Sequence, residues 1–213
     1  MSKSSLINRQ FICYLTGLLI LAVGSNLFLK ADLGVAPSCT IALVLTRLFS
    51  FGNYASFNFL TNFVLLICET FIEKKAGKKQ LIQLGLIFIY SLFIQLTSLP
   101  VQLITADLLS SRIMLSFIAC AVMAVGSSFT ICSGYAVLPM EGFISALSGK
   151  MHRSFGAIRI CVEVIMTVFS AVLSFIFLHN LSVIGIGTIL AAFLTGAVTN
   201  WFILHVIRKY KLC

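Results

Sequence analysis

Hydrophobic residues form six long runs along the chain, and polar residues lie mainly in the short segments between them. A helix that crosses the hydrocarbon core of a bilayer needs about 20 predominantly apolar residues, a length that each run reaches. The pattern therefore predicts an all-α membrane protein with six transmembrane helices. The runs cover approximately residues 10–29, 54–72, 81–101, 113–131, 155–178 and 182–207.

Two shorter segments, residues 37–50 and 139–154, each begin with a proline after a glycine-containing break. At a rise of 1.5 Å per residue the first would form a helix of about 20 Å, too short for a hydrocarbon core of ~30 Å. Proline suits the first position of a helix, because the N–H that it lacks would have no partner there. We expect two short helices, either re-entrant or interfacial, with helix breaks marked by Gly34, Pro37, Gly134 and Pro139.

The two halves of the chain carry matching features at a nearly constant separation of 102 residues. Each half contains three predicted spans, and an odd number of spans makes the second half enter the membrane from the opposite side. The sequence thus predicts an inverted 3+3 repeat of residues 1–104 and 105–213. Secondary transporters with such repeats place broken helices around a site near the bilayer midplane. The pairs with this separation are AVGS at 22–25 and 124–127, Pro37 and Pro139, and Gly85 and Gly187.

Composition supports a membrane protein, since 60% of residues are hydrophobic and only 10% are charged, against about half and about a quarter in soluble domains. The net charge of +9 does not indicate nucleic-acid binding, because the basic residues lie in small groups between apolar runs. With the N-terminus in the cytoplasm, eleven basic residues fall on the cytoplasmic side and three on the outer side. This bias predicts that both termini are cytoplasmic.

Ionisable and amide side chains within the predicted spans are the first candidates for a solute pathway, because such groups are costly in a membrane. The fifth run carries Arg159 and Glu163 on one helical stripe, and the second carries Asn58 and Asn62 on an equivalent stripe. Glu163 could bind a cation, an amine or a proton, or could simply pair with Arg159 one turn earlier. The two asparagines could instead form interhelical hydrogen bonds.

Further candidates lie beside the two breaks and in the last run. Asn26 and Ser127 precede the breaks at matching positions, and Asp32 and Glu141 lie where either could cap its own short helix. Asn200 follows a row of small residues that favours close helix packing. Glu69 and Glu73 adjoin the lysines at 74–79 and are expected to form interfacial ion pairs. The pathway candidates are Asn26, Asp32, Asn58, Asn62, Ser127, Glu141, Arg159, Glu163 and Asn200.

No enzymatic motif is present, and the seven cysteines include no CxxC pair. The sequence therefore predicts no catalytic residue, no metal site and no cofactor.

The run AVGSNLFLKADLGVAPSCT, a Phe-Gly start to the next span and the late GIGTILAAFLTGAV resemble the YczE/YyaS/YitT family of bacterial membrane proteins. The resemblance implies a multi-pass protein of the bacterial inner membrane and carries over no established substrate or catalytic residue. Ser38 stands where the family pattern leads us to expect tryptophan, so specificity could differ there.

We therefore expect a small permease or transporter for a small polar or amphiphilic metabolite. The alternative is a membrane partner, or a substrate-binding subunit of a larger complex, that does not transport by itself. The expected partners are membrane lipids and a small-molecule substrate, with a homodimer left open and nucleic acid excluded.

Overall fold

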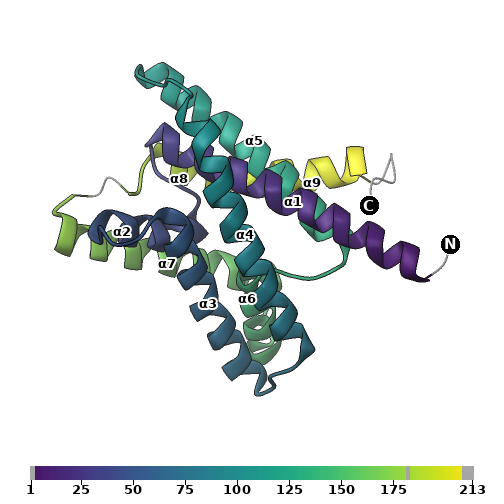
Figure 1. Ribbon diagram of the computed structural model, residues 1–213. Coiled ribbons are helices and arrows are strands. Elements are labelled where there is room, and N and C mark those ends of the chain that lie inside the picture. Colours follow the sequence, from purple (N-terminus) through teal and green to yellow (C-terminus); the bar gives the residue numbers. More distant parts are fainter. Residues whose placement is uncertain (1–2, 181–182, 208–213) are drawn as a thin grey trace.

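The computed structural model describes residues 3–180 and 183–207, which form helices joined by short loops and include no strand (Figure 1). Six helical segments in this part of the chain are long and apolar enough to cross a bilayer. The prediction of an all-α membrane protein with six spans is confirmed. The elements are α1 (Lys3–Ala31), η1 (Pro37–Cys39), α2 (Thr40–Leu48), α3 (Tyr54–Glu73), α4 (Lys78–Gln102), α5 (Leu109–Ser133), α6 (Pro139–Met151), α7 (Phe155–Leu178), α8 (Ile186–Leu190), η2 (Ala191–Thr195), α9 (Gly196–Phe202) and η3 (Ile203–Ile207).

The sixth span differs from the uniform helix that its apolar run predicts. It is α-helical in α8 and α9, but η2 and η3 have the wider π-helical hydrogen-bond pattern. π-Helical turns are rare and occur frequently at functional sites. Hydropathy alone does not distinguish them from an α-helix, since both present apolar side chains all round.

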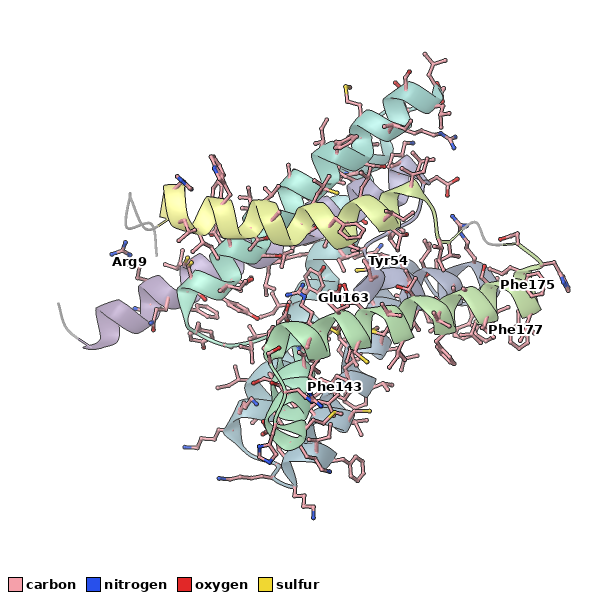
Figure 2. All side chains as sticks on the ribbon, turned by 180° about the vertical axis from the view of Figure 1, so that it is seen from behind. Arg9, Tyr54, Phe143, Glu163, Phe175 and Phe177 are labelled. Carbon is pink, nitrogen blue, oxygen red and sulfur yellow. The ribbon has the colours of Figure 1, made fainter. Side chains whose placement is uncertain are left out.

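The contacts between helices follow a pattern that repeats between the two halves. α1 packs along α5, α4 packs on α1, and α9 packs on α5. The short helix of each half also packs on a long helix of the other half: α6 packs on α3, and α2 packs on α7. One contact lacks a counterpart: α3 packs on α4, whereas α7 and α9 are not packed along one another and lie apart in Figure 2.

The crossing of α1 and α5 contains two reciprocal close contacts. A Cβ atom added to Gly24 would lie 3.0 Å from the backbone nitrogen of Met123, and one added to Gly126 would lie 2.7 Å from that of Leu21. Shifting the first pair by 102 residues gives the second pair with the halves exchanged. Reciprocal contacts of this kind are what a two-fold axis produces, so they support two related halves, while their orientation in a bilayer stays a prediction.

Both predicted helix breaks are present, and each uses a glycine in the left-handed region. Gly34 has φ of +96° and Gly134 has φ of +62°, conformations that cost little without a Cβ atom. Gly34 is also crowded, because a Cβ there would lie 2.7 Å from the backbone nitrogen of Gly185. Pro37 and Pro139 follow as the first residues of η1 and α6, as expected.

Candidate functional site

A central cavity of about 240 Å³ lies where the two broken segments meet the long helices. Its wall takes residues from α1, η1, α3, α4, α5, α6, α7, η2 and α9, so both halves of the chain contribute to it. In Figure 2 the labelled Glu163 lies near this junction. Its polar lining side chains are Ser38, Asn58, Asn62, Tyr90, Ser127, Thr130, Glu141, Arg159, Glu163 and Thr195.

The starts of both short helices form part of this wall. Pro37 and Ser38 contribute from η1, and Met140 and Glu141 contribute from the first turn of α6. The first backbone N–H groups of a helix lack intrahelical partners and carry a partial positive charge. Backbone polarity of this kind is tolerated at membrane depth only when it is buried in protein or lines a cavity.

The cavity contains one guanidinium and two carboxyl groups. Arg159 Nε donates to Glu163 Oε1 at 3.0 Å, so the ion pair expected one turn apart on α7 is present. Glu141 approaches from α6, and its Oε2 is buried without a hydrogen-bond partner among the residues that the structure describes. Burial raises the pKa of Glu141, nearby Arg159 lowers it, and Glu163 raises it further. An unpartnered carboxyl oxygen therefore remains open to a ligand.

Asn58 and Asn62 line the cavity, but within the described part of the chain they do not form the interhelical hydrogen bonds that were the alternative for them. Asn62 Nδ2 instead donates to Asn58 O at 2.9 Å and to Asn58 Oδ1 at 3.0 Å, both within α3. The expectation of interhelical bonds is wrong here, because this stripe of α3 faces the cavity and not a neighbouring helix.

Asn26 and Asp32 lie outside the central cavity. Asn26 Nδ2 donates to Ile94 O and to Thr97 Oγ1, each at 2.8 Å, and so joins α1 to α4. Asp32 pairs with Arg47 at 2.5 Å and with Arg112 at 3.8 Å. Neither Asp32 nor Glu141 caps its own short helix. The side chain of Asn200 lies outside the described residues.

Two further hollows flank the central cavity and differ in how they relate to it. A cavity of about 590 Å³, lined by Lys79, Gly134 and Ser145 among others, shares Glu141 and Arg159 with the central cavity. A hollow of about 330 Å³, which Asn26 lines, shares no lining residue with it. Glu141 and Arg159 therefore stand between the central cavity and the end of the molecule that carries Lys79.

A comparison with protein families identifies the family of the chain. Residues 8–204 match the model of a family described as "Family of unknown function (DUF6198)". The chain belongs to this family. No curated protein and no solved structure matches the chain, so what this DUF6198 protein does must be argued from its own residues.

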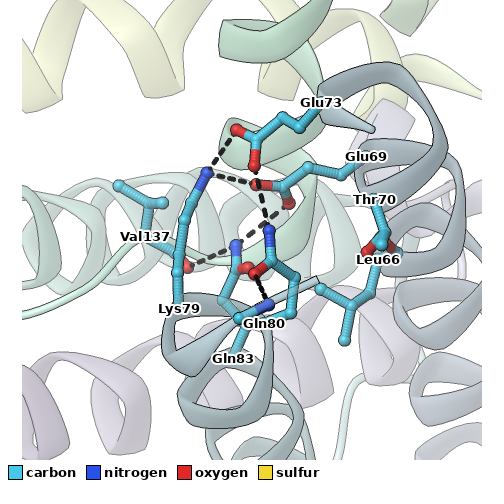
Figure 3. A network of polar contacts seen from close by, with 9 residues as sticks. Leu66, Glu69, Thr70, Glu73, Lys79, Gln80, Gln83 and Val137 are labelled. Carbon is cyan, nitrogen blue, oxygen red and sulfur yellow. Dashed lines mark hydrogen bonds and ion pairs between the residues drawn. The ribbon is translucent and has the colours of Figure 1, made fainter. Parts of the chain in front are cut away.

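The DUF6198 chain also contains a polar network around the buried Glu69 and Gln83, shown in Figure 3, that sequence reasoning placed in part. Lys79 Nζ lies 2.6 Å from Glu69 Oε1 and 2.7 Å from Glu73 Oε1, so the expected ion pairs are present. Glu69 itself is fully buried within the protein. Gln83 Nε2 donates to Glu69 Oε2 at 3.0 Å and to Val137 O at 3.3 Å, which joins α3 and α4 to the second break.

Sequence reasoning missed Tyr90 and Cys39 as lining residues of the DUF6198 cavity. Both lie in apolar or weakly polar surroundings in the sequence, where their side chains are typical of a buried core. The break could have suggested Cys39, because it lies two residues after the predicted break proline Pro37.

Proposed function

We propose that this protein is a small permease that moves a small polar or amphiphilic solute across a membrane. The observation that carries the proposal is the central polar cavity, whose wall is formed by the starts of both broken helices. Inverted-repeat transporters place their binding site at such a junction of discontinuous helices. The reciprocal contacts of Gly24 and Gly126 support the repeat on which this comparison depends.

The size and chemistry of the cavity favour a compact solute with hydrogen-bonding groups of both kinds. Its volume of about 240 Å³ is below the roughly 300–1,000 Å³ of sites for drug-sized ligands. The unpartnered oxygen of Glu141 would accept from an amine or hydroxyl. Asn58, Asn62 and Ser127 would form hydrogen bonds with neutral polar groups of the solute. Arg159 would donate to a hydrogen-bond acceptor on it.

The distribution of charge supports an orientation of the protein in the membrane. The cavity that shares Glu141 and Arg159 with the central one is also lined by Lys79, which belongs to the basic cluster at 74–79. Basic loops face the cytoplasm, so we assign this side to the cytoplasm and both termini with it. We further propose the bacterial plasma membrane and kinship with the YczE/YyaS/YitT group, on the resemblance of residues 22–40.

Cysteine labelling tests the pathway. In a cysteine-free background we place one cysteine in the central cavity (Met140→Cys), one in the cavity beside Lys79 (Ser145→Cys) and one in the hollow beside Asn26 (Ser98→Cys). A membrane-impermeant maleimide should label Ser145→Cys only from the cytoplasmic face and Ser98→Cys only from the outer face. Met140→Cys should be labelled from both faces, because a transported solute must reach the cavity from each.

Uptake into liposomes tests transport itself, with small amines, amino acids and carboxylic acids as the panel. Solutes that slow labelling of Met140→Cys should accumulate, and Glu163→Gln should reduce accumulation while Glu73→Gln, remote from the cavity, should not. Protection of Met140→Cys without uptake would instead support a substrate-binding subunit. Labelling of Met140→Cys from one face only, together with no uptake, would refute the permease.

A further inference from the structure

A groove of about 590 Å³ runs along the face of α3 and α4, separate from the three hollows described above. Its α3 side consists of residues at helical spacing from Phe63 to Lys74, a length of about 16 Å at 1.5 Å per residue. Phe71 on this face is 78% exposed and Leu81 on the α4 side is 71% exposed. The groove is lined by Phe63, Leu66, Ile67, Thr70, Phe71, Lys74, Lys75, Ala76, Gly77, Gln80, Leu81 and Leu84.

One end of this groove is basic and the rest is apolar. Lys74 and Lys75 line that end, and neither forms an ion pair or hydrogen bond within the described part of the chain. The adjacent carboxylate of Glu73 pairs with neither of them among the described residues, and its oxygens are bound by Lys79 at 2.7 Å and by Gln80 at 2.9 Å. The two lysines thus keep their charge available for an outside anion.

We propose that this groove binds one anionic phospholipid, with its phosphate at Lys74 and Lys75 and an acyl chain along α3 and α4. A long apolar groove that ends in two unpaired cations is complementary to an amphiphile with an anionic head. Basic pockets beside transmembrane helices on the cytoplasmic side recognise such headgroups. A soluble anion would leave the apolar length of the groove unused, and a zwitterionic lipid would bring no net charge to the lysines.

The experiment places a fluorescent reporter in the groove. The chain has one tryptophan, so Trp201→Phe combined with Phe71→Trp leaves a single tryptophan at the lining position. The protein is reconstituted in phosphatidylcholine vesicles that contain a minor fraction of phosphatidylglycerol, and either lipid is brominated in its acyl chains. Quenching by brominated phosphatidylglycerol should exceed the value set by its mole fraction.

Matched variants distinguish binding in this groove from a general attraction of anionic lipid to the basic protein. Each lysine near an anionic headgroup contributes about fivefold in affinity, so Lys74→Gln with Lys75→Gln should lower the relative binding constant by up to ~25-fold. Lys78→Gln with Lys150→Gln removes the same charge outside the groove. This pair should change the relative binding constant by no more than about twofold. A reporter at Phe175→Trp on α7, also in the Trp201→Phe background, should show no preference.

Salt provides a second readout that needs no lysine variant. Raising the ionic strength screens exposed charges, so the preference at the unmodified Phe71→Trp reporter should fall toward the mole-fraction value. Quenching by brominated phosphatidylglycerol that only matches its mole fraction at low salt would overturn the proposal. So would equal losses in the two lysine pairs, or an equal preference at Phe175→Trp. None of these results depends on whether the protein transports a solute.

Discussion

The close crossing of α1 and α5 makes a direct prediction about stability. A Cβ atom at Gly126 would lie 2.7 Å from the backbone nitrogen of Leu21 and 2.9 Å from the backbone oxygen of Gly17. Both neighbours are backbone atoms, so no side-chain rotation can relieve the contact, and the two helices must separate. By contrast, a Cβ atom at Gly85 on α4 meets nothing within 4 Å.

The expected changes in the free energy of unfolding have opposite signs at Gly126 and Gly85. Overpacking a well-packed contact costs about 1–3 kcal/mol, while alanine in place of glycine within a helix gains roughly 0.5–1 kcal/mol. Gly126→Ala should therefore lose about 1–2 kcal/mol, and Gly85→Ala should gain up to ~1 kcal/mol. For a chain of this size 1 kcal/mol changes the melting temperature by about 2–4 °C.

Thermal unfolding of both purified variants in the same detergent measures the difference. The melting temperature of Gly126→Ala should fall by roughly 2–8 °C, and that of Gly85→Ala should stay equal or rise. Gly24→Ala should lie between them, because its nearest neighbour is the flexible side chain of Met123. A Gly126→Ala variant as stable as Gly85→Ala would refute the close backbone crossing, and with it the reciprocal contact that supports the repeat.

Three other perturbations have defined outcomes. Lys79→Met leaves the buried carboxylate of Glu69 without its cation and should destabilise the protein by up to roughly 3–5 kcal/mol. The double variant Glu69→Gln/Lys79→Met should recover most of that loss in thermal unfolding, and no recovery would contradict the pairing. Because burial raises the pKa of Glu141, the ionised form costs stability above that pKa. Glu141→Gln should therefore be more stable than the parent protein at about pH 8, with a difference that shrinks as the pH falls and vanishes below the ordinary value of 4.5; a difference that grows toward acid would contradict this sign. A Cβ atom at Gly196 meets nothing within 4 Å although this residue lines the central cavity, so Gly196→Leu should fill it, abolish solute protection of Met140→Cys and leave the melting temperature within about 3 °C.

Local chemistry explains which parts of the fold could be predicted from the sequence. A proline that starts a helix and a glycine that adopts a left-handed conformation act through their own backbone, so Pro37, Pro139, Gly34 and Gly134 marked the breaks correctly. The six spans followed from the length of their apolar runs. The π-helical turns of the last span left no such signal, because they change the hydrogen-bond pattern and not the hydropathy.

The surroundings of each polar side chain depend on tertiary packing and were harder to predict. Asn26 and Ser127 occupy nearly equivalent positions in the two halves, yet Asn26 is bonded to α4 while Ser127 lines the cavity. The lysines that follow Glu69 in sequence predict its ion pair, but they do not reveal that Gly142 packs against this side chain and buries it. Sequence separation does not reveal which neighbour a side chain meets.

The unequal packing of the two halves has a consequence for motion. α3 rests on α4, whereas α7 has no such support from α9. If the two halves exchange their conformations, each takes up the helix contacts of the other. In that state α7 would pack on α9, and α3 would separate from α4. The contacts among Glu69, Lys79 and Gln83 bridge α3 and α4, so this bridge would have to open in any such exchange.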